Sequence, residues 1–208
     1  MRGALYVAYG EAARSEAVES IASLRAHNDL PVFCISDVKL DIELDGCCIG
    51  FPGGKGARWA KLMAETFVQD WDQFVYIDAD TRIRCDITAG FDILDDGWDI
   101  AMTPSANQGD DAFWHIGDDE MSATINEIGN PYPLQLQCGM MFVSRNERTE
   151  ELYDIWREEW LAWGDQDQAA FIRALHLCPV KLWLLGRPWN GGAIIKHRFG
   201  AIRTRGSA

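Results

Sequence analysis

The sequence predicts an α/β fold with three layers, a Rossmann-like arrangement around a mostly parallel, mixed sheet. Short apolar runs alternate with stretches of helical periodicity, and turn residues such as Pro52-Gly53-Gly54 separate them. This alternation is typical of strand–helix–strand units, whose crossover connections make neighbouring strands parallel. No internal repeat or linker interrupts the pattern, and 208 residues can enclose a substantial core. We therefore expect one domain over residues 1–208.

Each expected strand is a short apolar run that ends at a turn or polar residue. The first run stops at Gly10, the second at Asp37, and the fourth at Asp78. The run that contains Gly139 is apolar throughout, as expected of a strand buried on both faces. The strands expected along the chain are residues 4–9, 31–36, 47–51, 74–77, 98–103 and 137–144.

Each expected helix carries apolar residues three and four positions apart. Val18 and Ile21 mark the first helix, Trp59 and Leu62 the second, and Trp156 a later one. This spacing places the apolar side chains on one face that packs against a sheet. The helices expected along the chain are residues 12–27, 56–70, a segment around 152–160, and 166–176.

Residues 105–133 have a different character, because they are polar, acidic and weakly periodic, and they end in Pro131-Tyr132-Pro133. An irregular connection of about 25 residues in a compact domain is usually a functional loop or an insertion. His115 lies inside it and is expected to be a solvated loop histidine.

Composition excludes several classes of protein. The net charge of −13 argues against nucleic-acid partners and anionic membranes. No uncharged apolar run reaches the ~18 residues of a membrane span, and the amino terminus lacks a signal-peptide pattern, so we expect a cytoplasmic protein. The cysteines are then expected to be reduced and buried; they are Cys34, Cys47, Cys48, Cys85, Cys138 and Cys178.

The charge is distributed unevenly along the chain. No acidic residue follows Asp167, whereas seven lysines and arginines do. One interpretation is a solvated basic tail that balances an acidic body. The other is that the carboxyl-terminal segment folds over an anionic ligand.

The strand at 74–77 leads directly into Asp78-Ala79-Asp80. Side chains alternate along an extended chain, so Asp78 and Asp80 point the same way and Ala79 points the other. Two carboxylates at the carboxyl end of a strand can hold a hard divalent cation, and open α/β sheets bind ligands at that edge. The pattern predicts a metal-bridged phosphate ligand.

Five motifs follow one another in an order that resembles a known family. They are Asp78-Ala79-Asp80-Thr81, Gln137-Cys138-Gly139, Gly164-Asp165-Gln166-Asp167, Trp189-Asn190 and Ile194-Ile195-Lys196-His197-Arg198-Phe199-Gly200. Together they resemble the GT-A fold glycosyltransferases, similar to family 8, which includes glycogenin and bacterial galactosyltransferases. The resemblance implies transfer of a sugar from a nucleoside diphosphate donor, with UDP-sugars favoured, to an unidentified acceptor, and retention of anomeric configuration.

The resemblance also implies roles for particular residues. Asp78, Asp80 and His197 would hold Mn²⁺ or Mg²⁺, and a mixed carboxylate and imidazole set suits manganese. Gln166 and Asp165 would act near the reacting sugar carbon, and residues 105–133 would face the acceptor. Residues 187–208 would close the donor site, where Lys196 and Arg198 could neutralise phosphate oxygens. Donor contacts would come from Ala8, Tyr9, Gly10, Arg58, Lys61, Asp78, Ala79, Asp80, Gly139, Trp189, Lys196 and Gly200.

Some of these residues have structural alternatives. Lys61 could instead pair with Glu65 one helical turn on. Asp165 with Gln168 three residues later is a variant of the capping box, which would begin a helix. Gln137 departs from the asparagine that the family usually carries there, which puts the polar contact at this position in doubt.

Other classes of protein share parts of the pattern. Asp78-Ala79-Asp80-Thr81 also resembles the nucleophile motif of haloacid dehalogenase phosphatases, but Arg82 stands where that motif has threonine. A nucleotidyltransferase shares the doubly wound core, yet no Gly-rich basic segment occurs near residue 10. A silent protein that binds sugar nucleotides and transfers nothing would keep the same metal motif.

Overall fold

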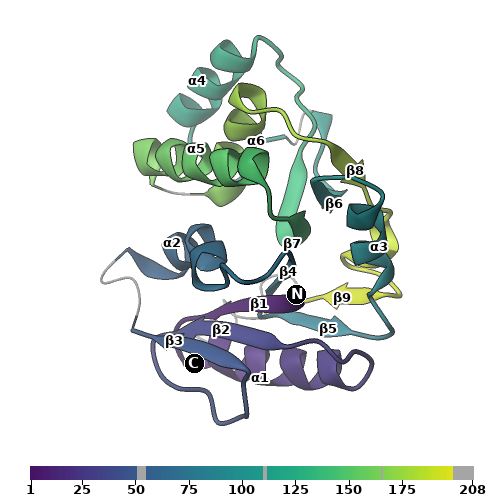
Figure 1. Ribbon diagram of the computed structural model, residues 1–208. Helices are drawn as coiled ribbons and strands as arrows, with labels where there is room; N and C mark the ends of the chain where they lie inside the picture. Colours follow the sequence, from purple (N-terminus) through teal and green to yellow (C-terminus); the bar gives the residue numbers. More distant parts are fainter. Residues whose placement is uncertain (51–54, 110–111, 165, 199–208) are drawn as a thin grey trace.

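The structure is a computed structural model that describes residues 1–50, 55–109, 112–164 and 166–198. Its central sheet has seven strands in the order β3-β2-β1-β4-β7-β6-β8, and β5 and β9 form a separate pair (Figure 1). The strands are β1 (Arg2–Ala8), β2 (Val32–Ser36), β3 (Gly46–Ile49), β4 (Gln73–Asp78), β5 (Thr81–Ile83), β6 (Ile100–Pro104), β7 (Leu136–Ser144), β8 (Leu182–Leu184) and β9 (Ile195–His197).

The sheet is mixed and mostly parallel, as the sequence predicts. Strands β3, β2, β1 and β4 pair in parallel, and so do β6 and β8. Strand β7 runs antiparallel to both of its neighbours, β4 and β6. Because β7 inserts beside β4 in the opposite direction, its amino-terminal half lies next to the carboxyl end of β4, where Asp78 is.

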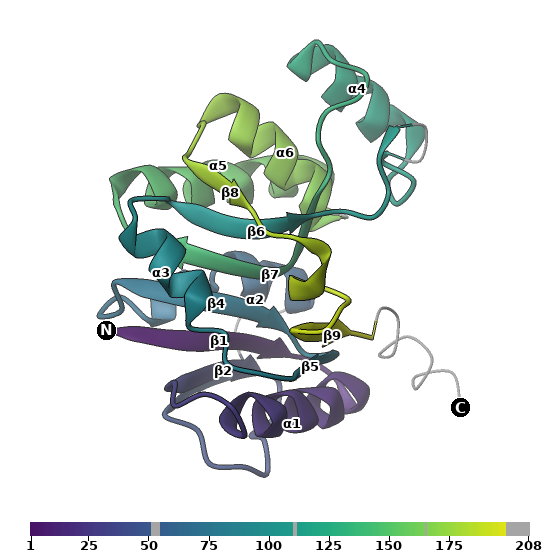
Figure 2. The same ribbon diagram turned by 90° about the vertical axis from the view of Figure 1, so that its right-hand side faces the viewer.

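Helices cover both faces of the sheet (Figure 2). Helices α2 and α5 lie behind the sheet in this view, and α1 and α3 lie in front of it. The helices are α1 (Glu11–Arg25), α2 (Gly56–Leu62), α3 (Ala89–Asp95), α4 (Asp118–Ile128), α5 (Glu147–Trp163) and α6 (Asp167–Leu177), with 3₁₀ turns η1 (Ala64–Phe67) and η3 (Arg187–Trp189).

A hydrophobic core fills the space on each side of the sheet. Trp156, from α5, packs behind the sheet with Phe74 of β4. Tyr6 and Phe142 point to the other face, where they meet the apolar sides of α1 and α3. The alternation of buried side chains between two faces is the reason that β1, β4 and β7 read as continuous apolar runs.

The structure corrects two of the expected elements. The helix expected over 56–70 breaks at Met63 into α2 and η1. Arg157 donates a hydrogen bond of 2.9 Å to the carbonyl of Leu62, which satisfies an acceptor at the break. Residues 105–133, expected to be irregular, contain the 11-residue helix α4, which closes at Gly129 in the left-handed conformation.

The cysteines are free in the part of the chain that the structure describes, which agrees with the expectation of reduced thiols. Cys34, Cys138 and Cys178 are buried, whereas Cys47 is exposed, so the expectation of burial holds only in part. Among the described helices, none combines the length and the apolar character that crossing a membrane requires.

We expect Gly90→Ala to destabilise the fold by about 1–3 kcal/mol, because a methyl group there overpacks the core. A Cβ at Gly90, in α3, would lie 2.3 Å from Cζ of Phe142, whose ring is buried against Phe91. Gly117 is the matched control, since a Cβ there meets no atom within 4 Å among the described residues. Urea unfolding of both variants tests this; equal stability of the two would contradict it.

Candidate functional site

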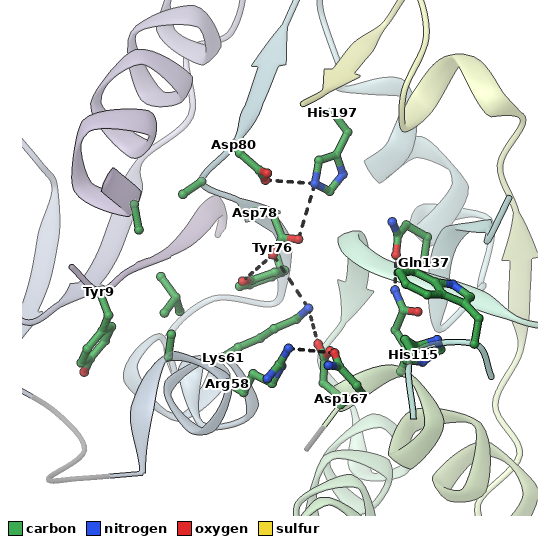
Figure 3. A pocket seen from close by; sticks show the side chains of 17 residues that line it. Tyr9, Arg58, Lys61, Tyr76, Asp78, Asp80, His115, Gln137, Asp167 and His197 are labelled. Carbon is green, nitrogen blue, oxygen red and sulfur yellow. Dashed lines mark hydrogen bonds and ion pairs between the residues drawn. The ribbon is translucent and has the colours of Figure 1, made fainter. Parts of the chain in front are cut away.

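A cavity of about 590 Å³ opens at the carboxyl ends of β1 and β4 (Figure 3). Asp78 ends β4, and Tyr9 follows β1 directly. The described residues that line the cavity are Val7, Tyr9, Ala13, Ala57, Arg58, Lys61, Tyr76, Asp78, Ala79, Asp80, Trp114, His115, Gln137, Gln166, Asp167, Gln168 and His197. The cavity therefore lies at the sheet edge where open α/β folds bind ligands.

Asp78, Asp80 and His197 form a cluster in this cavity, and one ligand atom of each lies within 4.8 Å of the others. His197 Nε2 is 3.0 Å from Asp80 Oδ1 and 3.7 Å from Asp78 Oδ2. The two carboxylates thus point to one place, as the strand alternation predicts. They also meet an imidazole from a distant part of the sequence.

The two-stranded sheet of β5 and β9 positions His197 beside the carboxylates. β5 begins immediately after Asp80 and pairs antiparallel with β9, so that Thr81 lies opposite His197. The backbone N–H of Arg198 donates a bond of 2.8 Å to the carbonyl of Asp80. This pairing fixes the register of β9, and a shift by one residue would turn His197 away from the site.

Asn190 orients the His197 ring. Its Oδ1 lies 2.7 Å from His197 Nδ1, and because an amide oxygen only accepts, Nδ1 carries the proton. Nε2, on the opposite side of the ring, faces Asp78 and Asp80. Metal-ligating histidines commonly bind through one ring nitrogen while the other donates to a partner of this kind.

The geometry of the cluster requires a glycine at position 139. A Cβ there would lie 2.5 Å from His197 Cε1 and 2.6 Å from Asp78 Oδ2. Gly139, on β7, therefore leaves the space into which Asp78 and His197 converge.

Electrostatics keep Asp80 ionised. Burial by itself would raise the pKa of this carboxyl group, but the hydrogen bond and charge of His197 outweigh burial and hold the pKa below its usual range. An ionised Asp80 is the form that binds a cation.

A second group of charges lies below the cluster. Lys61 Nζ is 2.5 Å from Asp167 Oδ2 and 3.9 Å from Asp78 Oδ1, and it sits 4.7 Å above the Tyr76 ring. Burial would lower the pKa of Lys61, but Asp167 and Asp78 overcome it and raise the pKa. The alternative pairing of Lys61 with Glu65 is wrong, because Glu65 binds Arg157 at 2.7 Å.

Arg58 lies on the same face of α2 as Lys61, as the spacing predicts, and both line the cavity. Its Nη2 donates a bond of 2.7 Å to Gln166 Oε1. The cap of α6 is Gln166, one residue later than a capping box at Asp165 requires. The side chain of Asp165 lies outside the described residues, and Gln168 donates to Gln137 Oε1 instead.

The structure does not bring every expected donor contact to the cavity. Among the described lining residues, Ala8, Gly10, Gly139, Trp189 and Lys196 are absent. Ala8 is buried, and the N–H of Gly10 donates to Asp37. Trp189 packs edge-on against Phe142 at 5.7 Å.

Lys196 is exposed because it alternates with His197 along β9. Arg198, expected to neutralise phosphate, binds the buried carboxylate of Glu16 at 2.9 Å. The expectation at Gly200 lies outside the described residues.

Sequence reasoning missed part of the lining. Asp167 forms an ion pair with Lys61, and the hydroxyl of Tyr76 donates a hydrogen bond of 2.9 Å to Asp78 Oδ1. His115, expected in solvent, lines the cavity beside Trp114 and Gln168. The repeated acid in Asp165-Gln166-Asp167 could have pointed to Asp167, and the alternation along β4 could have pointed to Tyr76. No pattern marks Trp114 or His115.

The chain has the GT-A glycosyltransferase fold. Similar solved structures are the WbbM bifunctional glycosyltransferase (15% identity, TM-score 0.62), the glycosyltransferase GlyE of Streptococcus pneumoniae (16%, 0.58) and the galactosyltransferase LgtC (14%, 0.57). They match 90%, 91% and 90% of this chain, and it spans 39%, 47% and 74% of theirs. No protein-family model matches the sequence, and no curated protein matches it significantly.

Proposed function

We propose that this protein is a metal-dependent glycosyltransferase that moves a sugar from a nucleoside diphosphate donor, with a UDP-sugar favoured, to an acceptor hydroxyl group. The observation that carries the proposal is the convergence of Asp78, Asp80 and His197 at the carboxyl edge of a GT-A sheet. The LgtC structure contains donor and acceptor sugar analogues, and its fold is similar to that of this chain.

The residues of the cluster fit a divalent cation, Mn²⁺ or Mg²⁺. The contact of His197 Nδ1 with Asn190 Oδ1 orients Nε2 toward the carboxylates, and Gly139 leaves the space in which Asp78 and His197 meet. The cation would be held by Asp78, Asp80 and His197, and it would stabilise the negative charge of the departing nucleoside diphosphate as a Lewis acid.

The remaining lining residues suit the two ends of a donor. Tyr9 lies on one side of the carboxylates in Figure 3, where a nucleoside would rest, and Ala79 lines the same cavity. Arg58 holds Gln166 toward the cavity, where its amide can contact the transferred sugar. Retention of configuration is part of the proposal. Closure of the donor site by the carboxyl-terminal segment is supported by residues 187–198, which carry Asn190 and His197 to the carboxylates.

A thermal-shift screen of nucleoside diphosphate sugars, with and without Mn²⁺, tests donor binding. A ligand at 100 times its Kd stabilises by about 2.7 kcal/mol, which corresponds to a rise in Tm of roughly 5–10 °C at this chain length. We expect the rise only when Mn²⁺ and the correct donor are both present. Asp80→Asn should remove it, and Asp92→Asn, an exposed carboxylate on α3, should not.

The same samples, analysed for donor hydrolysis by mass spectrometry, separate the alternatives. Metal-dependent release of free sugar supports the transferase. Binding with no hydrolysis and no transfer to any acceptor would favour the silent sugar-nucleotide binder, and phosphate release with an aspartyl-phosphate on Asp78 would establish the phosphatase.

A further inference from the structure

One wall of the cavity is built from amide and aromatic side chains. Gln137 and His115 lie on the opposite side of the carboxylates from Tyr9 (Figure 3). Trp114 and Gln168 line the same cavity and contact them, Trp114 through the His115 ring and Gln168 through the Gln137 amide. None of these four residues, which we call the acceptor wall, carries a carboxylate, an ammonium or a guanidinium group.

Trp114 is presented to solvent by a strained backbone. Its side chain is 65% exposed, although it lines the cavity. The preceding Phe113 has φ of 63°, and it is the one non-glycine residue with a positive φ in the described part of the chain. A bulky residue in this conformation is unfavourable and persists where the surroundings hold it, which is common at ligand sites.

The surroundings do hold Phe113. Its ring is 2% exposed and packs in a small cluster with Ala169 and Ile172 of α6. The buried Phe113 therefore anchors the segment, and the positive φ directs the next residue outward instead of into the core.

A buried polar network fixes the rest of the segment to the fold. Arg173 on α6 is 1% exposed, and its Nη1 donates bonds of 3.1 Å to Glu120 and 2.8 Å to Thr124, both on α4. Its Nε donates a bond of 2.7 Å to Glu159 on α5. Arg173 therefore ties α4, the helix that follows Trp114, to α6, and it ties α6 to α5.

The amides of the wall keep hydrogen-bonding capacity for a ligand. Gln168 Nε2 donates to Gln137 Oε1, which uses one donor and one acceptor of the pair. The other halves, Gln137 Nε2 and Gln168 Oε1, make no hydrogen bond with a described residue. A hydroxyl group both donates and accepts, so it can satisfy both halves.

We propose that the acceptor is a neutral saccharide that stacks the apolar face of one ring on Trp114. Its hydroxyls bind the amides of Gln137 and Gln168. This inference rests on the proposed function and names the substrate class of the same site. In the transfer, the bond from the sugar anomeric carbon to the diphosphate oxygen breaks and a bond to the acceptor oxygen forms. The hydroxyl proton leaves with the nucleoside diphosphate.

Saturation-transfer NMR and transfer assays with methyl glycosides and neutral disaccharides test the inference, in the presence of UDP-sugar or UDP and Mn²⁺. We expect saturation of the protons on one face of the saccharide. Trp114→Ala should raise the KM for the saccharide about tenfold or more, and Trp114→Phe should recover most of the loss. The matched control is Trp183→Ala on the edge strand β8, 42% exposed and outside the described cavity lining, which should leave KM unchanged.

Several outcomes would overturn the inference without touching the proposed function. Donor hydrolysis by the unmodified protein tests that function separately. If hydrolysis occurs but only glucuronides, or only serine- and threonine-containing peptides, serve as acceptors, then the neutral-saccharide assignment is wrong. An unchanged KM in a folded Trp114→Ala variant would remove the stacking role.

Discussion

Alanine at position 139 is expected to reduce metal-dependent donor turnover by about 100-fold or more while the protein stays folded. The added methyl group would lie within 2.6 Å of Asp78 Oδ2 and of His197 Cε1, so at least one of these side chains must move. Misplacement of a reacting or ligating group by about 1 Å typically costs two orders of magnitude in rate. The backbone at Gly139 itself accommodates alanine, because its φ is outside the positive range.

Initial rates of donor hydrolysis at a series of Mn²⁺ concentrations measure the effect, and circular dichroism with a thermal melt establishes that the variant is folded. Gly117→Ala again serves as the control, since its Cβ enters open space. Full activity of folded Gly139→Ala with an unchanged Mn²⁺ dependence would mean that Asp78 and His197 do not act together.

Removal of the Lys61 charge is expected to lower the free energy of unfolding by about 3–5 kcal/mol. Lys61→Met would leave Asp167 buried beside Asp78 with no ammonium group between them. Removing one partner of a buried pair is costly because the other charge stays desolvated. Replacing both partners by apolar residues of similar size is often nearly neutral.

A double-variant cycle tests this explanation by urea unfolding. Lys61→Met with Asp167→Leu should recover much of the stability that Lys61→Met loses. Arg25→Met provides the exposed comparison, since its ion pair with Asp45 at 3.4 Å should be worth less than about 1 kcal/mol. A double variant as unstable as the single one would show that packing, not charge, sets the cost.

Acid should remove the stabilisation that the ion pair of Lys61 with Asp167 provides. Burial would raise the pKa of Asp167, but the Lys61 charge outweighs it and holds the pKa below the ordinary value. A carboxyl group with a lowered pKa in the folded state stabilises above its unfolded pKa, near 4, and the contribution disappears as the pH falls through the folded value. Stability of the natural chain should therefore fall below about pH 4 more steeply than that of Asp167→Asn.

Local patterns were sufficient to predict the layers of the fold and the central carboxylates. Apolar runs such as the one through Val75 identified the strands, because a strand that is buried on both faces carries apolar side chains at successive positions. Alternation along the chain placed Asp78 and Asp80 on one side. The resemblance supplied His197, and the structure brings it to the carboxylates.

Long-range contacts set the limit of what could be predicted. Strands β5 and β9 have three residues each, too few for a periodic signal. The partner of Lys61 is more than 100 residues away, so local spacing favoured Glu65 instead. Arg198 was expected to be available to phosphate, but it forms an ion pair with the buried Glu16. No local feature of the sequence predicts that pairing.

The pairing of β5 with β9 also imposes an order on biosynthesis. Asp78 and Asp80 leave the ribosome early, yet the histidine that joins them is encoded 117 residues after Asp80. Because chains are made from the amino terminus, the sheet of β1, β2 and β4 can collapse while this histidine is still unmade. The nascent protein therefore holds two carboxylates without their imidazole, and the cluster of three side chains is complete only once translation has passed residue 197.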